Sequence, residues 1–282
     1  MTEAIAERLS RYTLDGGDED LRRLVRISQH SANALRAALQ RIQISEGSKV
    51  IECGCGPIGG LAVLAETVGA SGRVVGVDFN ESAVQRARSL IATLALDNVE
   101  VLAGDVHDLD LAALGGPFDL AYTRCFLMHQ SDTAKTLARL AELVRPGGWI
   151  VCQEPLRAPA PRSHPHLDAL TDYWELLHAL VERVGVPRCS IEDLPRVAAD
   201  SALEVHEAEG FFNVMASDEG FELHAGTLAA IREGATQTGI ATAEQLDELL
   251  AALRSAKHEK YQWVSTPFFL DLALRKPSQS KD

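Results

Sequence analysis

The chain has 282 residues, of which 46% are hydrophobic, and its 40 acidic side chains outnumber its 27 lysines and arginines to give a net charge of −13. This length and apolar content are enough for one large α/β domain with insertions. A surface so acidic repels nucleic acid and anionic membranes, and we expect neither as a partner. Because no apolar run could span a membrane and the first residues lack the pattern of a signal peptide, we expect a cytoplasmic protein.

The five cysteines are scattered along the chain, and four of them lie on or beside strand-like segments. We expect them to be small buried hydrophobic residues in a reducing compartment. The pair Cys53-x-Cys55 lacks the spacing of metal ligands and has no matching second pair, so we expect no metal site.

The first predicted element is a helix over residues 18–40, where apolar side chains recur at helical spacing from Leu21 to Leu39. A loop with two adjacent glycines, Gly16 and Gly17, precedes this helix and carries Tyr12.

A glycine-rich stretch follows at residues 49–60. A short apolar run meets Glu52 and is followed by Gly54, Gly56 and Gly59, then by a second apolar segment. This order predicts a strand, a tight turn and a helix, with glycines where the backbone turns sharply and approaches a ligand. The spacing Gly54-x-Gly56-x-x-Gly59 also matches the dinucleotide fingerprint, which leaves an NAD-dependent oxidoreductase as an alternative.

Strand-like and helix-like segments then alternate, which predicts a parallel sheet. Asp78 ends the second strand-like run and Asp105 follows the third. Asn80 and Ser131 can cap the helices that begin after them. The fourth and fifth strand-like runs lie at residues 118–123 and 149–153.

The alternation breaks at residues 155–190, which begin with four prolines and continue as a helix. This insertion follows the C-terminal end of a strand, where open α/β sheets bind ligands, so we expect it to cap an acceptor pocket. Residues 219–258 predict a helical insertion before the last strand, with a capping box from Thr242 to Gln245. This insertion could serve as a lid or as the contact of a homodimer.

In order and spacing, the glycine turn, the two strand-end aspartates and the two later strands resemble the class I S-adenosylmethionine (SAM) methyltransferases that act on small molecules. The resemblance implies an α/β fold with a Rossmann-like, seven-stranded, mostly parallel sheet and helices on both faces. It divides the chain into an N-terminal helical lid, residues 1–48, and a SAM-binding core, residues 49–282. Within the core, residues 155–190 and 219–258 are the helical insertions.

The resemblance also implies SAM as the cofactor and a role for each matched position. Asp78 would bind the ribose hydroxyls and Phe79 one face of the adenine. Asp105 and the Val106 amide would bind the adenine edge, and the backbone near Thr123 and Arg124 the methionine ammonium. The loop before the first helix would place Tyr12 against the sulfonium, by cation–π attraction, or leave it as a packing residue. Gly54 and Gly56 would let the methionine part approach the backbone.

The charge of Glu52 favours SAM over a dinucleotide such as NAD as the ligand of the glycine turn. Two residues before the first glycine, a carboxylate would repel a pyrophosphate, whereas it attracts the ammonium and sulfonium of SAM. Many relatives carry Asp at this position. Glu52 has the same charge, but its longer side chain places the carboxylate further from the backbone.

The family reaction is the transfer of a methyl group to an acceptor atom, which requires positioning and, for some acceptors, removal of a proton. His129 is the first candidate base because it follows the fourth strand, and Glu154, at the end of the fifth strand, is the second. The apolar residues before His129 indicate a small, partly apolar metabolite of secondary metabolism, methylated on O, N or C. A SAM-fold protein that rearranges or cyclises its substrate without methyl transfer is a further alternative.

Overall fold

The computed structural model describes residues 19–185, 191–256 and 262–278. The chain divides into two compact units. The first consists of Met1–Glu154, Asp193–Glu209 and Asp271–Asp282, and the second of Pro155–Glu192 and Gly210–Leu270. The predicted insertions at residues 155–190 and 219–258 fall in the second unit. Their predicted roles as cap, lid or dimer contact stay predictions.

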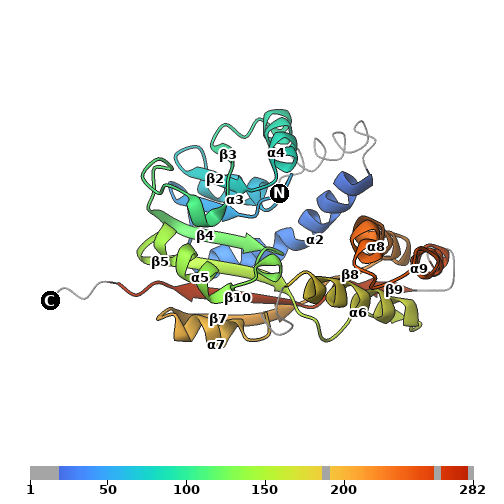
Figure 1. Cartoon of the computed structure of the whole chain (residues 1–282). Helices are drawn as coiled ribbons and strands as arrows, with labels where there is room; N and C mark the ends of the chain where they lie inside the picture. Colours follow the sequence, from blue (N-terminus) through green and yellow to red (C-terminus); the bar gives the residue numbers. More distant parts are fainter. Residues whose placement is uncertain (1–18, 186–190, 257–261, 279–282) are drawn as a thin grey trace. The chain divides into compact units, whose positions relative to one another are not determined.

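The first unit is built on a seven-stranded sheet with the order β3-β2-β1-β4-β5-β10-β7 (Figure 1). The strands are β1 (Lys49–Cys53), β2 (Arg73–Asp78), β3 (Val99–Ala103), β4 (Phe118–Arg124), β5 (Val144–Pro155), β7 (Glu204–Phe211) and β10 (Phe269–Arg275). The pairs β1–β2, β1–β4, β2–β3 and β4–β5 are all parallel. This confirms the α/β class with a mostly parallel sheet. The order places β10, the last strand in sequence, between β5 and β7.

Helices lie on both sides of this sheet (Figure 1). They are α2 (Glu19–Arg41), α3 (Leu61–Val68), α4 (Glu81–Leu94), α5 (Thr133–Leu143) and α7 (Leu194–Asp200), with short 3-10 turns η1 (Val106–Asp108) and η2 (Leu127–His129). The predicted cap of α4 is confirmed, because the Asn80 side chain accepts from the N–H groups of Ser82 and Ala83. The predicted cap Ser131 is wrong. Asp132 caps α5 instead, because its carboxylate accepts from the N–H three residues later.

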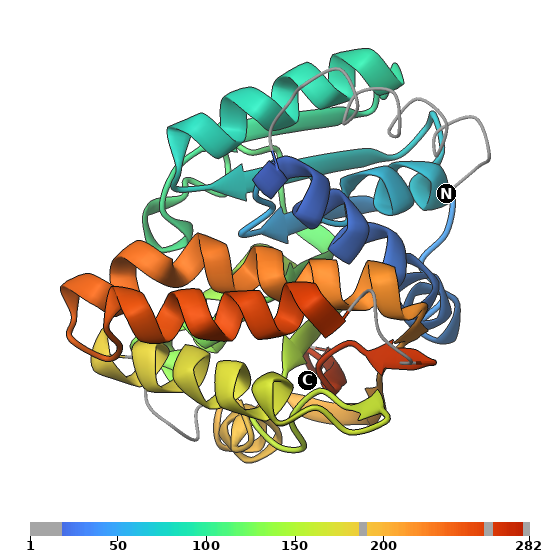
Figure 2. The same cartoon turned by 90° about the vertical axis from the view of Figure 1, so that its right-hand side faces the viewer.

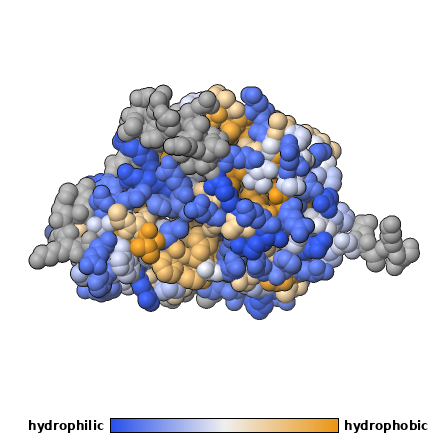
Figure 3. All heavy atoms as spheres, turned by 180° about the vertical axis from the view of Figure 1, so that it is seen from behind, coloured by the Kyte–Doolittle hydropathy of each residue, from blue (hydrophilic) through white to orange (hydrophobic). Residues whose placement is uncertain are grey.

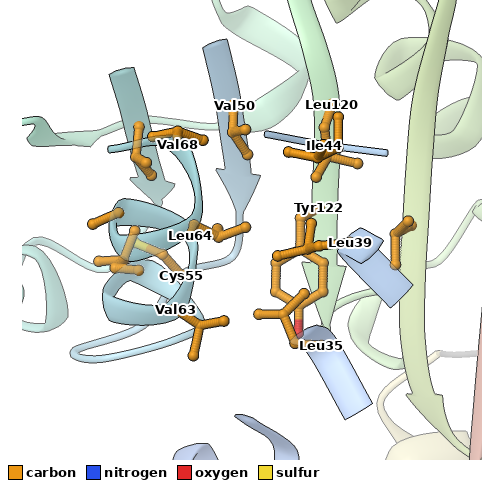
Figure 4. Close-up of a cluster of buried hydrophobic side chains, with 14 of the residues drawn as sticks. Leu35, Leu39, Ile44, Val50, Cys55, Val63, Leu64, Val68, Leu120 and Tyr122 are labelled. Atoms are coloured by element: carbon orange, nitrogen blue, oxygen red, sulfur yellow. The ribbon is translucent and has the colours of Figure 1, made fainter. Parts of the chain in front are cut away.

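The core of the first unit lies where α2 and α3 meet the central strands. Leu35 and Leu39 of α2 lie beside the ring of Tyr122 on β4, and Leu64 of α3 belongs to the same buried cluster (Figure 4). Tyr122 and Leu64 have no exposed surface. Burying such side chains contributes roughly 1.5–3 kcal/mol each, which fixes α2 on the sheet.

The second unit contains α6 (Asp168–Arg183), α8 (Ser217–Gln237), α9 (Ala243–Ala256) and a small sheet of β6 (Ser163–His164), β9 (Trp263–Ser265) and β8 (Val214–Met215), in that order. The three helices pack side by side (Figure 2) around a core of their own. The predicted capping box before α9 is confirmed. The Thr242 hydroxyl accepts from the Gln245 N–H, and the Gln245 side chain accepts from the Thr242 N–H.

The surface in Figure 3 is mostly hydrophilic, in keeping with the excess of acidic residues. Among the residues that the structure describes, no helix is both long and apolar enough to cross a membrane.

Candidate active site

The glycine turn is tied to the end of the neighbouring strand. Gly54 and Gly56 have φ angles of 73° and 55°, in the left-handed region that favours glycine. The Gly54 N–H donates to the carbonyl of Val77 at 2.8 Å, and the Gly56 N–H donates to Asp78 Oδ2 at 2.8 Å. A Cβ added at Gly56 would meet no atom within 4 Å. The turn is therefore held from the β2 side while its backbone at Gly56 faces open space.

The loop that follows β4 packs directly on this turn. A Cβ added at Gly54 would lie 2.3 Å from Cδ2 of Phe126, a distance that real Cβ atoms do not adopt. Glycine at position 54 thus brings the post-β4 loop and the glycine turn into contact.

Glu52, at the end of β1, is 1% exposed. Its Oε1 accepts from the Gly60 N–H at 2.7 Å, and a Cβ at Gly59 would lie 2.3 Å from the same oxygen. Burial raises the pKa of Glu52 to about 8, against the opposing effects of Arg124 and the Gly60 N–H. Its Oε2 is buried and has no hydrogen-bond partner within the described ranges.

Helix α2 is attached to the same turn. The Ser28 hydroxyl donates to the carbonyl of Gly59 at 2.7 Å, and Arg36 forms an ion pair with Glu66 of α3 at 2.8 Å. The described part of the predicted lid is thus in contact with the glycine turn, while Tyr12 lies outside the described residues. A lid function for residues 1–48 stays a prediction.

The acids predicted to bind the nucleoside lie at the ends of adjacent strands. The other carboxylate oxygen of Asp78, Oδ1, accepts from the Asn80 N–H at 2.9 Å. Phe79 beside it is 82% exposed, which leaves its ring free to stack on a planar group. Asp105 follows β3, is exposed and caps η1 through the His107 N–H. Val106 is 6% exposed, so at this position the main chain rather than the side chain is suited to contact a ligand.

Glu154 organises the backbone that follows β4. Its carboxylate accepts from the N–H groups of Phe126 and Leu127 at 3.0 Å and of Met128 at 3.3 Å. Burial raises the pKa of Glu154 to about 7, although these three donors favour the ionised form. The sequence predicts an acid that acts on the acceptor, whereas the structure shows this acid bonded to three backbone groups.

His129 ends η2, three residues beyond Phe126, whose carbonyl accepts from the His129 N–H at 3.0 Å. The side chain is exposed, yet the surrounding protein displaces enough water to lower the pKa of its imidazole below 6.5. A neutral imidazole at pH 7 can accept a proton. Thr123, fully buried, and Arg124, half-buried, end β4 just before this loop.

The structure also contains a buried polar network that sequence reasoning missed. The Tyr122 hydroxyl donates to Gln153 at 2.7 Å, and Gln153 donates to Asp271 of β10 at 3.2 Å. Arg41, in the last turn of α2, contacts the same Asp271 oxygen at 3.4 Å. Burial raises the pKa of Asp271 to about 6. The sequence does contain a sign of this network, because Gln153 and Asp271 are polar residues within otherwise apolar strand segments.

A hollow of about 610 Å³ lies elsewhere in the first unit. Its lining includes Gly72, Arg73 and Val99, where β2 and β3 begin, at the opposite ends of these strands from Asp78 and Asp105. We therefore place the ligand site on the glycine turn and not in this hollow.

The residues present fit SAM. The buried, unpartnered Oε2 of Glu52 can carry negative charge once a cation binds beside it, the open face of Gly56 allows close approach, and the Phe79 ring offers a stacking surface. These three features suit a cofactor that carries a positive charge and an adenine ring. Across the described ranges, no group of His, Cys, Asp and Glu side chains could hold a metal ion.

Comparisons with known proteins agree with this geometry. Residues 44–203 match the family model described as a methyltransferase domain. An uncharacterized 37.1 kDa protein in transposon TN4556 of Streptomyces fradiae is 32% identical over 217 residues, which are 76% of this chain and 61% of that protein. A demethylmenaquinone methyltransferase of Bacillus cereus is 32% identical over 129 residues, or 45% of this chain and 54% of that enzyme. The chain thus spans less than two thirds of the length of either relative.

Solved structures share the fold. The [4+2]-cyclase SpnF has a TM-score of 0.55 and 18% identity, covering 89% of this chain and 83% of that one. Geranyl diphosphate C-methyltransferase from Streptomyces coelicolor A3(2), solved with S-adenosyl-L-homocysteine, has a TM-score of 0.53 and 15% identity, covering 90% and 82%.

Proposed function

The chain belongs to the methyltransferase-domain family and has the fold of the class I SAM-dependent methyltransferases, and from this premise we propose that it transfers a methyl group from SAM to an O, N or C atom of a small, partly apolar metabolite. One observation carries the proposal. The buried carboxylate of Glu52 lies against a glycine turn whose backbone is open at Gly56, with Asp78 at the end of the adjacent strand.

Bound SAM supplies an electrophilic methyl group, so the protein has to hold and orient the two reactants. In the proposal, Glu52 attracts the cationic cofactor, and Asp78 and Asp105 accept from its ribose and adenine. Glu154 fixes the turn that presents His129, and His129 accepts a proton from the acceptor atom where one has to leave.

The similarity to demethylmenaquinone methyltransferases supports a partly apolar acceptor, and the acidic surface supports a partner other than nucleic acid. We place the activity in the secondary metabolism of the cytoplasm. The fold is equally that of a [4+2]-cyclase, so a rearrangement or cyclisation without methyl transfer is the second candidate.

The test is incubation with SAM and a metabolite extract, followed by mass spectrometry. Methyl transfer produces S-adenosylhomocysteine together with a product in which one hydrogen is replaced by a methyl group. SAM binding with a rearranged product of unchanged mass would establish the second candidate. Absence of SAM binding, with an absorbance change in the nicotinamide band, would return the assignment to an oxidoreductase.

Asp78→Ala is expected to weaken SAM binding by roughly 1–3 kcal/mol, because the ribose hydroxyls lose a charged acceptor and the Gly56 N–H loses its partner. Isothermal titration calorimetry measures the change. Glu81→Ala, at an exposed position three residues on, is the control and should bind SAM as the parent does. Unchanged SAM affinity in a folded Asp78→Ala protein would remove Asp78 from the site.

His129→Ala is expected to lower turnover by about 10²–10⁴-fold with normal SAM affinity, which is the usual effect of losing a positioned base. Because the pKa of His129 lies below 6.5, the parent enzyme should lose activity only as the pH falls through that lower value. The alanine variant should lack this acid limb. Turnover within a few-fold of the parent would exclude His129 from the mechanism.

A further inference from the structure

The second unit contains a hollow of about 540 Å³, within the range of small-molecule sites. Its lining residues come from one proline-rich segment, the start of α6 and β9. They are Pro159, Ala160, Pro161, Arg162, Ser163, His164, His166, Thr171 and Trp263.

Strand pairing explains why these side chains share one side. β6 pairs antiparallel with β9, with His164 directly opposite Trp263. Side chains alternate along a strand, so Arg162 and His164 project to one side, while Ser163 between them is 7% exposed and donates to the Pro165 carbonyl. Arg162 is held through its backbone, because its N–H donates to Ser265 Oγ at 2.9 Å and its carbonyl accepts from the Ser265 N–H at 2.7 Å.

The lining of the hollow includes Arg162 and has no Asp or Glu. The hollow is therefore basic, although the chain as a whole has a net charge of −13. The Arg162 side chain is exposed and forms no ion pair with the described residues, whereas Arg157 and Arg196 in the same sequence region pair with carboxylates. His166 does have an acidic neighbour, because its Nε2 lies 3.0 Å from Asp168, so we assign the charge of the site to Arg162.

The hollow also has an aromatic wall. The rings of His164 and Trp263 are nearly parallel, with an angle of 21° and a centroid distance of 6.2 Å. The indole of Trp263 is half-buried and lines the same hollow as Arg162, so the hollow offers both an apolar face and a cation.

We propose that this hollow is a binding site for a small aromatic carboxylate, whose ring lies on Trp263 and whose carboxylate is bound by Arg162. All the groups it requires belong to the second unit. The inference goes beyond methyl transfer and holds whether or not the ligand is the methyl acceptor.

The test measures the binding of 2-naphthoate to the full chain by calorimetry. Two comparison probes each lack one feature: 2-naphthamide has the ring without the charge, and cyclohexanecarboxylate has the charge without the aromatic ring. Each is expected to bind at least about tenfold more weakly, as the loss of one charged or stacking contact predicts.

Arg162→Gln should weaken the binding of 2-naphthoate at least about tenfold, so that it binds no more tightly than 2-naphthamide. In Trp263→Leu, 2-naphthoate should bind no more tightly than cyclohexanecarboxylate. Arg183→Gln is the matched control, because Arg183 is an exposed arginine of α6 that does not line the hollow. SAM affinity, measured in the same samples, shows that each variant is folded and tests the proposed function separately. The proposal is overturned if 2-naphthoate fails to bind at millimolar concentration, or if it binds Arg162→Gln as well as it binds Arg183→Gln.

Discussion

Glu52→Gln is expected to weaken SAM binding while it makes the protein more stable at alkaline pH. Because Glu52 is buried with a pKa of about 8, its ionised form destabilises the folded state. The protonated side chain is the form that the folded state prefers. Its contribution to stability is complete below the pKa of about 4.5 that Glu52 has in the unfolded chain, and it is lost as the pH rises through 8. Glutamine keeps an acceptor for the Gly60 N–H without the charge, so the free energy of unfolding at pH 9 should rise by about 1–4 kcal/mol.

The binding of SAM should release a proton from the parent protein at pH 7. A cationic ligand stabilises the ionised carboxylate and lowers the pKa of Glu52, so the proton that it holds in the free protein is lost. Calorimetry in buffers of different ionisation enthalpy measures this release, which Glu52→Gln should abolish. Glu81→Gln removes the same charge from an exposed position and should change neither quantity. Equal proton release by the parent and Glu52→Gln would contradict the assignment.

Glu154→Ala is expected to lower the free energy of unfolding by about 3 kcal/mol or more. The substitution leaves the buried N–H groups of Leu127 and Met128, and that of Phe126, without an acceptor. Glu154→Gln should be affected less, because its amide oxygen can still accept from Phe126 and Leu127. Urea unfolding measures the difference, and hydrogen exchange should show faster exchange at these three amides in the alanine variant.

The control for Glu154 is Glu142→Ala, which removes an acid that is 65% exposed and paired with Arg139 on α5. Such a surface pair contributes at most about 1 kcal/mol. If the free energy of unfolding of Glu154→Ala is no lower than that of Glu142→Ala, the three hydrogen bonds to Glu154 do not stabilise the turn that follows β4.

The parts of the fold that follow local rules could be predicted from the sequence. The glycines after β1 and the side chain of Asn80 act on neighbouring residues, so their types at those positions indicate a turn and a helix start. The cap of α5 was missed by one residue because Ser131 and Asp132 can both cap a helix, and only the backbone decides which one lies at the first turn.

The parts of the site that depend on distant contacts could not be predicted. Glu154 accepts hydrogen bonds from N–H groups 26 to 28 residues earlier in the chain. Almost every residue type has a backbone N–H, so the sequence does not indicate which residues donate. The contact between Arg41 and Asp271 spans 230 residues. The ring of Phe126 on Gly54 likewise depends on how β1 and β4 pair, and this is why the sequence predicts Gly54 as a ligand contact without its neighbour.

The position of β10 has a consequence for how the protein is made. Ribosomes release the chain from its N-terminus, so β5 and β7 are both synthesised before the strand that lies between them in the sheet. Until Phe269–Arg275 has emerged, the nascent protein has β5 as an open, apolar edge that can pair with other chains. Strand β10 is thus the one that closes the gap between β5 and β7, and the need for a chaperone should be highest after β7 has emerged and before β10 follows.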